Sequence, residues 1–242
     1  MNLKGRHILV SGAARGLGAV IARHLAEAGA RLTLTDILEE EGRAVAAELS
    51  ADFHPVDLRD PASVAALGTQ LDGPLHGLVN NGAIATGIGG IGFEDVDIDT
   101  WDRVMEVNVR GTWLMTRAAS PALRASGSGR IVNVASDTAL WGAPNLMSYV
   151  ASKGAVIAMT RSLARELGPD GIGVTAIAPG ILTTESTEYV PQARHDQYGQ
   201  GRAVPGAQPP EDVAGTVAFL LSEAALTLTG QVLPVNRGFV FT

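Results

Sequence analysis

The distribution of apolar residues is the feature that most constrains the fold of this 242-residue chain. Short apolar runs of strand length alternate with amphipathic stretches of helix length along the sequence. This alternation is typical of an α/β protein in which helices cover both faces of a mainly parallel sheet. We therefore expect a three-layer, doubly wound fold with a seven-stranded sheet. The predicted strands are residues 7–11, 31–35, 53–56, 75–80, 130–135, 174–178 and 231–235, and the predicted helices are 16–28, 39–49, 61–71, 100–125, one that carries Tyr149 and ends near 168, and 212–222.

The sequence shows no internal repeat, low-complexity tract or linker, so we expect one domain over residues 1–242. One segment, residues 183–210, holds several Pro and Gly residues and is too long for an ordinary connection. Tyr189, His195 and Tyr198 give this segment side chains that can pack. We therefore predict a lid over a binding site, and a disordered insertion is the alternative.

A glycine-rich turn, SGAARGLG at residues 11–18, joins the first predicted strand to the first predicted helix. Gly12 permits a tight turn, Gly16 lets the backbone approach a pyrophosphate, and Gly18 allows the helix to pack closely on the sheet. The helix amino terminus supplies free N–H groups and the positive end of the helix dipole. Such a turn is weak evidence alone, but its place between the first strand and the first helix favours a dinucleotide site.

Asp36 lies at the end of the second predicted strand. A carboxylate in this place can accept hydrogen bonds from the adenosine ribose and repels a 2′-phosphate, which favours NAD over NADP. Arg15 could instead attract that phosphate, and Asp36 could also cap the next helix. Asp57, after the third strand, is predicted either to bond the adenine amino group or to form a plain turn.

Tyr149 and Lys153 are four residues apart, and Ser136 follows the apolar run that precedes them. Residues at this spacing share one face of a helix, so an ammonium would lie beside a phenol. A phenol has an ordinary pKa of about 10, and a nearby cation lowers that pKa. Tyr149 could then exchange a proton with an alcohol near neutral pH, while Ser136 hydrogen-bonds the same oxygen. Separately, each residue could be a surface, capping or turn residue.

The composition excludes several classes of function. The chain contains no cysteine, which excludes disulfides, thiol catalysis and Cys-ligated metal sites. Its formal net charge is −7 without a basic cluster, which argues against nucleic acid and anionic membrane as partners. No apolar run approaches the ~18 residues that span a bilayer, and we see neither a signal peptide nor metal-ligand spacing, so we expect a cytoplasmic protein without a metal.

With these motifs assembled, the sequence resembles the short-chain dehydrogenase/reductase family over nearly its whole length. The family's Asp-Gly-Gly near the carboxyl end is replaced by Asn236-Arg237-Gly238. The resemblance implies a Rossmann fold and hydride transfer between a nicotinamide cofactor and an alcohol or ketone. The matching motifs are residues 11–18, Asn80-Asn81-Gly82-Ala83 with the family's last two residues exchanged, Asn108, Ser136, Tyr149 with Lys153, and Pro179-Gly180 followed by Thr184.

The resemblance also implies roles for individual residues. Tyr149 is the expected general acid/base, and Lys153 lowers its pKa and bonds the nicotinamide ribose. Ser136 orients the substrate oxygen, and Asn108 holds a water that relays protons from Lys153. The residues expected to bind the cofactor are Gly12, Arg15, Gly16, Leu17, Gly18, Asp36, Asp57, Leu58, Asn80, Gly82, Tyr149, Lys153, Pro179, Gly180, Leu182 and Thr184.

The substrate is expected in the crevice at the carboxyl ends of the strands. Trp141, Leu146 and Met147 suggest an apolar wall, and Tyr189 could close over it. A hydrophobic or aromatic secondary alcohol and its ketone fit best. The alternatives are a 3-oxoacyl-ACP reductase, against which Asp36 argues through its preference for NAD, and an NAD-binding scaffold without catalysis.

The helix predicted at 100–125 and the Tyr149 helix carry more apolar residues than one sheet face requires. They include Met105, Val109, Trp113, Met159 and Leu163. Deeper burial within the monomer is one explanation, and a helix–helix subunit interface is the other. The family resemblance favours the interface and a homotetramer.

Overall fold

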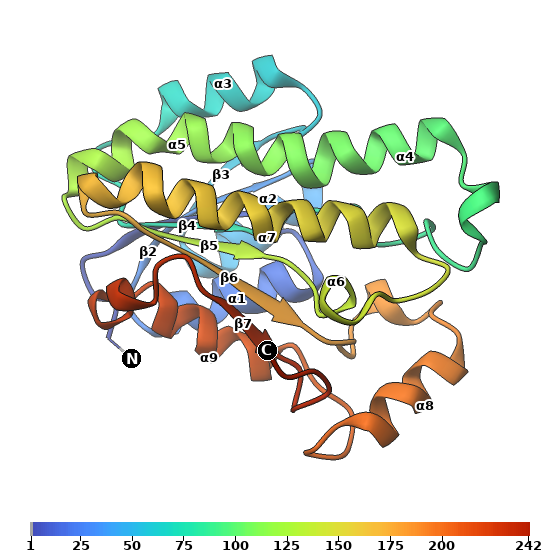
Figure 1. Cartoon of the computed structure of the whole chain (residues 1–242). Coiled ribbons are helices and arrows are strands. Elements are labelled where there is room, and N and C mark those ends of the chain that lie inside the picture. Colours follow the sequence, from blue (N-terminus) through green and yellow to red (C-terminus); the bar gives the residue numbers. More distant parts are fainter. Residues whose placement is uncertain (1) are drawn as a thin grey trace.

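The computed structural model describes residues 2–242. Seven parallel strands form one sheet in the order β3-β2-β1-β4-β5-β6-β7 (Figure 1). Strands β1, β4, β5 and β6 are buried at every position, as expected for a parallel sheet covered on both faces. The predicted doubly wound fold is thus confirmed. The strands are β1 (His7–Ser11), β2 (Arg31–Asp36), β3 (Asp52–Pro55), β4 (Gly77–Asn80), β5 (Arg130–Val134), β6 (Gly173–Pro179) and β7 (Val232–Val235).

Two helical layers enclose the sheet. On one face, α1 (Gly16–Glu27), α2 (Glu39–Leu49) and α9 (Glu211–Leu220) contribute to one buried apolar cluster. On the other face, α3 (Pro61–Gln70), α5 (Thr112–Ser126) and α7 (Met147–Leu167) contribute to a second cluster. The short elements are η1 (Phe93–Asp95), α6 (Thr138–Trp141), η3 (Gly168–Asp170), η4 (Glu185–Thr187), α8 (Gln192–Gly201) and η5 (Glu223–Leu228). No helix within residues 2–242 is both long and apolar enough to cross a bilayer.

The single helix predicted at residues 100–125 is more irregular than expected. It consists of α4 (Ile98–Met105), a π-helical segment η2 (Glu106–Gly111) and α5 in direct succession. It also starts earlier, because the Asp97 side chain accepts a hydrogen bond from Thr100 N and caps α4. The wider π-helical turn contains Asn108, and such turns are frequent at functional sites.

The strand order locates the ligand crevice. The chain moves outward from β1 to β2 and β3, then crosses to β4 on the other side of β1. In sheets of this kind, ligands bind outside the carboxyl ends of the strands at this reversal. The segment at residues 183–210 lies at the same end and contains α8, which stands apart from the two layers in Figure 1.

Candidate active site

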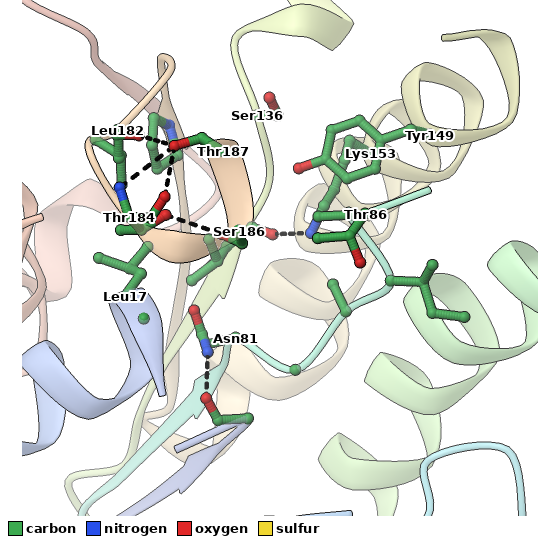
Figure 2. A pocket seen from close by; sticks show the side chains of 18 of the residues that line it. Leu17, Asn81, Thr86, Ser136, Tyr149, Lys153, Leu182, Thr184, Ser186 and Thr187 are labelled. Atoms are coloured by element: carbon green, nitrogen blue, oxygen red, sulfur yellow. Dashed lines mark hydrogen bonds between the residues drawn. The ribbon is translucent and has the colours of Figure 1, made fainter. Parts of the chain in front are cut away.

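One large cavity, of about 960 Å³, runs along the carboxyl ends of the strands. Its wall combines the glycine-rich turn, the ends of β2, β4, β5 and β6, the start of α7, and the segment that contains α8. Figure 2 shows Tyr149 and Lys153 facing this space from α7, with Leu17 and Asn81 further along it. The cavity therefore joins the predicted dinucleotide site to the predicted catalytic residues.

The glycine-rich turn is built so closely that it requires glycine. Gly12 has a φ of +67°, and a Cβ there would lie 2.5 Å from Gly82 Cα. A Cβ on Gly18 would overlap the Gly12 carbonyl group and lie 2.5 Å from Asn81 Nδ2. These contacts bring the start of α1 close against β1 and β4 and leave backbone N–H groups at the cavity wall. The turn thus fits a pyrophosphate at a helix amino terminus.

Asp36 is half-buried at the end of β2 and lines the cavity. Its Oδ2 accepts a hydrogen bond from Ala14 N at 2.9 Å, and its Oδ1 accepts one from Leu38 N at 3.0 Å. A carboxylate has about four acceptor positions, so it keeps capacity for ribose hydroxyls. The second bond forms a local turn before α2, and the α2 N-cap residue, Leu38, makes no side-chain cap. Arg15 also lines the cavity and is exposed.

All but one of the residues expected at the cofactor line the cavity. Asp57 accepts a hydrogen bond from Arg59 N at 2.8 Å and forms an ion pair with the Arg59 guanidinium. It therefore forms a turn, which is one of the two roles predicted for it. Those that line the cavity are Gly12, Arg15, Gly16, Leu17, Gly18, Asp36, Asp57, Leu58, Gly82, Tyr149, Lys153, Pro179, Gly180, Leu182 and Thr184.

Asn80 is the exception, and the structure corrects its expected place. Its buried Nδ2 donates to Thr116 Oγ1 at 3.1 Å and to Asn133 Oδ1 at 2.8 Å, away from the cavity. Asn81 lines the cavity instead, and its Nδ2 donates to Gly12 O at 2.9 Å. Successive side chains alternate at the end of a strand, so only one of the two asparagines can face the turn.

Ser136, Tyr149 and Lys153 meet in the cavity as predicted from their spacing. Lys153 is almost fully buried, its Nζ donates to Val134 O at 2.7 Å, and the same Nζ lies 5.6 Å from the centroid of the Tyr149 ring. Ser136 Oγ accepts hydrogen bonds from Thr138 Oγ1 at 2.9 Å and from Thr138 N at 3.3 Å. Thr138, a residue that the sequence did not single out, therefore orients the serine hydroxyl.

The predicted lowering of the Tyr149 pKa is wrong for this structure. Burial raises the pKa of Tyr149 to about 12, and the hydrogen bond with Ser136 offsets only part of this effect. Burial also lowers the pKa of Lys153 to about 8. Lys153 is buried and Tyr149 is half-buried, and desolvation disfavours the charged form of each. At neutral pH the phenol is therefore neutral and the amine mostly charged.

Asn108 lies in the π-helical segment, and its side chain is committed to protein partners. The amide accepts a hydrogen bond from Ile84 N at 2.7 Å and donates to Ile84 O at 3.0 Å and to Ser152 Oγ at 3.0 Å. Both amide hydrogens are thus used, and Asn108 is absent from the cavity wall. The side chain holds the Ile84 backbone, which does line the cavity.

Only two of the four residues expected at the substrate line the cavity. Leu146 and Tyr189 line the cavity, whereas Trp141 and Met147 do not. Trp141 packs edge-on against Tyr198 and Phe239, and the Met147 side chain is 41% exposed. Residues in one loop point in different directions, and the sequence gives no sign of the aromatic cluster that draws Trp141 away.

The segment at residues 183–210 closes one side of the cavity. Tyr189 Oη donates to Ala85 O at 2.7 Å, across to the loop after β4. Arg194 on α8 donates to Pro144 O at 3.2 Å and lies over the Trp141 ring. Its guanidinium is therefore occupied at the rim. These contacts hold the segment against the loop after β4 and against the stretch between Ser136 and Tyr149.

Known proteins resemble this chain along its whole length. A family model described as enoyl-(acyl carrier protein) reductase matches residues 12–240. The 3-alpha-(or 20-beta)-hydroxysteroid dehydrogenase of Mycobacterium bovis is 40% identical over 243 residues, covering 98% of this chain and 90% of that protein. The chain belongs to the short-chain dehydrogenase/reductase family. It is an oxidoreductase that acts on the CH–OH group of an alcohol or on the corresponding ketone.

Two solved structures show the same fold with different forms of the cofactor. The 3-ketoacyl-(acyl-carrier-protein) reductase from Brucella melitensis, complexed with NADH, has a TM-score of 0.90 and 34% identity, covering 99% of this chain and 100% of its own. A putative gluconate 5-dehydrogenase from Beutenbergia cavernae, with bound NADP, has a TM-score of 0.90 and 34% identity, covering 98% of both chains. The family to which this chain belongs thus uses either nicotinamide dinucleotide.

Proposed function

We propose that this short-chain dehydrogenase/reductase transfers a hydride between NAD(H) and a hydrophobic or aromatic secondary alcohol or its ketone. One observation carries the proposal. A single cavity is lined at one end by Asp36 and the glycine-rich turn and at the other by Ser136, Tyr149 and Lys153. A bound nicotinamide supplies the hydride chemistry, and the chain supplies position, protons and a site of restricted water.

In ketone reduction, Tyr149 is the proton donor. Its pKa of about 12 keeps the phenol protonated at neutral pH, ready to donate to the carbonyl oxygen as negative charge develops there. Ser136 is the second donor: its Oγ accepts from Thr138, and the hydrogen that it directs to Tyr149 in the free enzyme can turn to the substrate oxygen. The charged Lys153 stabilises the phenolate that Tyr149 becomes.

Asn108 acts in this proposal by position. Its side-chain amide fixes the Ile84 backbone at the cavity wall. Both amide hydrogens are used, so the side chain has none left to donate to the predicted relay water, and the backbone oxygen of Asn108 accepts a bond from Thr112 Oγ1 at 2.8 Å.

Asp36 supports NAD rather than NADP. A 2′-phosphate beside this carboxylate would face like charge at a half-buried site, whereas ribose hydroxyls could donate to it. Titration of NADH and NADPH into the wild type is expected to give at least about tenfold tighter binding of NADH. Asp36→Ala, which leaves Arg15 in place, is expected to shift this ratio toward NADPH by about 10- to 100-fold, since one charge contact contributes ~1.5–3 kcal/mol. A wild type that prefers NADPH would contradict the assignment.

The apolar part of the wall supports a hydrophobic substrate. Ile84, Leu146, Ile181 and Val190 line the cavity that also holds Tyr149. The relative from Mycobacterium bovis is described as acting on hydroxysteroids, which are hydrophobic secondary alcohols. A 3-oxoacyl-ACP reductase is the second candidate, favoured by the Brucella neighbour of that description.

A ketone panel tests these assignments directly. NADH oxidation is followed with acetophenone, cyclohexanone, a 3-ketosteroid and acetoacetyl-CoA. Turnover of the first three supports the proposal, and preference for the thioester supports the second candidate. Tyr149→Phe is expected to abolish turnover while NADH binding survives. Undiminished turnover in that variant would refute the role of Tyr149, and NADH binding without turnover of any ketone by the wild type would favour a scaffold.

The outer face of α4, η2, α5 and α7 supports self-association. A shallow apolar groove there is lined by Met105, Val109, Trp113 and Met159, with Trp113 44% exposed, and by Glu106 and Arg110. A second copy of the chain could cover this groove by helix–helix packing. This groove supports an interface between two copies, and the family resemblance supports a homotetramer as the proposed assembly. Light scattering at micromolar concentration is expected to give the mass of a tetramer for the wild type and a smaller mass for Met159→Glu. A monomeric mass for the wild type would refute the proposed assembly.

A further inference from the structure

A buried acid directly follows Ser136 in the chain. Asp137 is fully buried, and Tyr198 Oη donates to its Oδ1 at 2.6 Å. Asn236 Nδ2 donates to its Oδ2 at 3.1 Å. Trp141 Nε1 in turn donates to Tyr198 Oη at 3.2 Å. Both side-chain contacts on the carboxylate come from donors, which suit its ionised form and offset part of the burial that raises its pKa.

The side-chain partners of Asp137 come from two other parts of the chain. Tyr198 lies on α8, within the proposed lid, and is only 2% exposed. Asn236 follows β7, and its Oδ1 accepts hydrogen bonds from Gly238 N and Phe239 N. The Phe239 ring stacks on Tyr198 with centroids 4.1 Å apart. One carboxylate therefore joins the Ser136 loop, the lid helix and the carboxyl-terminal segment.

We propose that Asp137 is a positioning residue that anchors the lid helix α8 to the Ser136 loop and makes α8 a fixed wall of the substrate site. The inference rests on the proposed function, because it concerns the lid of that site. The arm at residues 183–190 has a weaker attachment, since Tyr189 is 51% exposed while it bonds Ala85 O. Substrate therefore enters beneath this arm, and α8 stays in place.

Several charged groups surround this carboxylate. Arg202, on the carboxyl-terminal side of α8, attracts Asp137 and donates to Ile181 O at 2.6 Å. The other titratable or charged groups that act on Asp137, Tyr198 or Arg202 are Tyr149, Arg194, Asp212 and Arg237.

Asn236 is the residue that makes a decisive test possible. Asn236→Asp would place a second carboxylate oxygen about 3 Å from Asp137, an acceptor against an acceptor, unless the two share a proton. The double exchange, Asp137→Asn with Asn236→Asp, reverses the donor and the acceptor. The new amide at position 137 would donate to the new carboxylate at position 236 and accept from Tyr198. That carboxylate would still accept from Gly238 N and Phe239 N. The net charge is unchanged, and the double exchange restores the side-chain bonds among positions 137, 198 and 236.

Limited trypsin digestion reads the attachment of α8 without any need for a substrate. Arg194 and Arg202 are the cleavage sites on and next to α8, and cleavage requires local opening of that helix. Rates are normalised to an unstructured peptide at each pH. At about pH 8, Asn236→Asp is expected to be cut at these sites about 10- to 100-fold faster than the wild type, the equivalent of one charge-assisted hydrogen bond. At about pH 5.5 the difference shrinks, because two close carboxylates then share a proton.

Two further variants keep the inference testable if Asn236→Asp folds poorly. The double exchange is expected to return cleavage to within a few-fold of the wild type. Tyr198→Phe keeps the ring stack, loses one bond, and is expected to be cut several-fold faster, with a raised KM for ketone and an unchanged Kd for NADH. Wild-type cleavage rates in both Asn236→Asp and Tyr198→Phe, or no rescue by the double exchange, would overturn the anchor. Failure of the proposed function would appear differently, as absent ketone turnover in the wild type with this cleavage pattern intact.

Discussion

Gly18→Ala is the sharpest perturbation that the glycine-rich turn offers. The new Cβ would overlap the Gly12 carbonyl group and lie 2.8 Å from its carbon and 2.5 Å from Asn81 Nδ2. Carbon contacts are comfortable at ~3.5–4.0 Å, so these atoms must separate by about 1 Å. They cannot yield easily, because a Cβ at Gly12 would itself meet Gly82 Cα at 2.5 Å and the turn is packed on both sides.

Two effects are expected from this displacement. Overpacking of a closely fitted site costs ~1–3 kcal/mol of unfolding free energy. Moving the amino terminus of α1 away from the cavity also weakens at least one N–H contact to a phosphate, a loss of ~1.5–3 kcal/mol and hence about 10- to 100-fold in the Kd for NADH. Urea denaturation measures the first effect, and fluorescence titration with NADH and NADPH measures the second.

Gly215→Ala is the matched control. Gly215 is exposed within α9, and a Cβ there would meet no atom within 4 Å. Alanine is a better helix former than glycine, so this variant is expected to gain ~0.5–1 kcal/mol of stability with the Kd for NADH unchanged. If Gly18→Ala bound NADH within twofold of the wild type, the close packing of this turn would not position the cofactor, and the reasoning would fail.

Three further outcomes follow from the site. The pKa of Lys153 is about 8, so kcat/KM for ketone reduction is expected to fall as the pH rises through about 8, and Lys153→Met to lose that limb in a pH-rate profile. Burial raises the folded-state pKa of Asp137 to about 6 from 3.8. The contribution of this group to the unfolding free energy is therefore full below about pH 4, and ~3 kcal/mol of it is lost as the pH rises through 6. Urea unfolding of Asp137→Asn is expected to lack this pH-dependent loss. Tyr189→Phe removes the bond to Ala85 O and is expected to raise KM about 2- to 10-fold with kcat nearly unchanged in steady-state assays.

The sequence predicted those features that depend on local pattern. Periodicity identified all seven strands, and the spacing of Gly12, Gly16 and Gly18 identified the turn. The i, i+4 spacing of Tyr149 and Lys153 predicted that they share a face, and both do line the cavity. Each of these depends on residues close together in the chain, whose relative geometry the helix or strand determines.

Features that depend on distant partners were not predictable in this way. Asn80 and Asn81 are equally plausible from the motif, and only the pairing of Asn80 with Thr116 and Asn133 separates them. The sequence predicted Trp141 in the substrate wall, whereas in the structure Trp141 packs against Tyr198 and Phe239. Asp137 carried no signal at all, because its partners lie 61 and 99 residues further along the chain.

The charge state of Tyr149 shows most clearly why spacing alone was insufficient. Lys153 Nζ lies 5.6 Å from the centroid of the Tyr149 ring. At an effective dielectric constant of about 20, a cation at roughly that distance attracts a phenolate by ~3 kcal/mol, or about 2 pKa units. Even that full attraction would only return a pKa of about 12 to the ordinary ~10, since burial has moved it the other way. The free enzyme therefore presents an acid, which suits ketone reduction at neutral pH. Alcohol oxidation needs the phenolate and is expected to rise with pH while reduction falls, so parallel pH profiles in the two directions would contradict this account of the site.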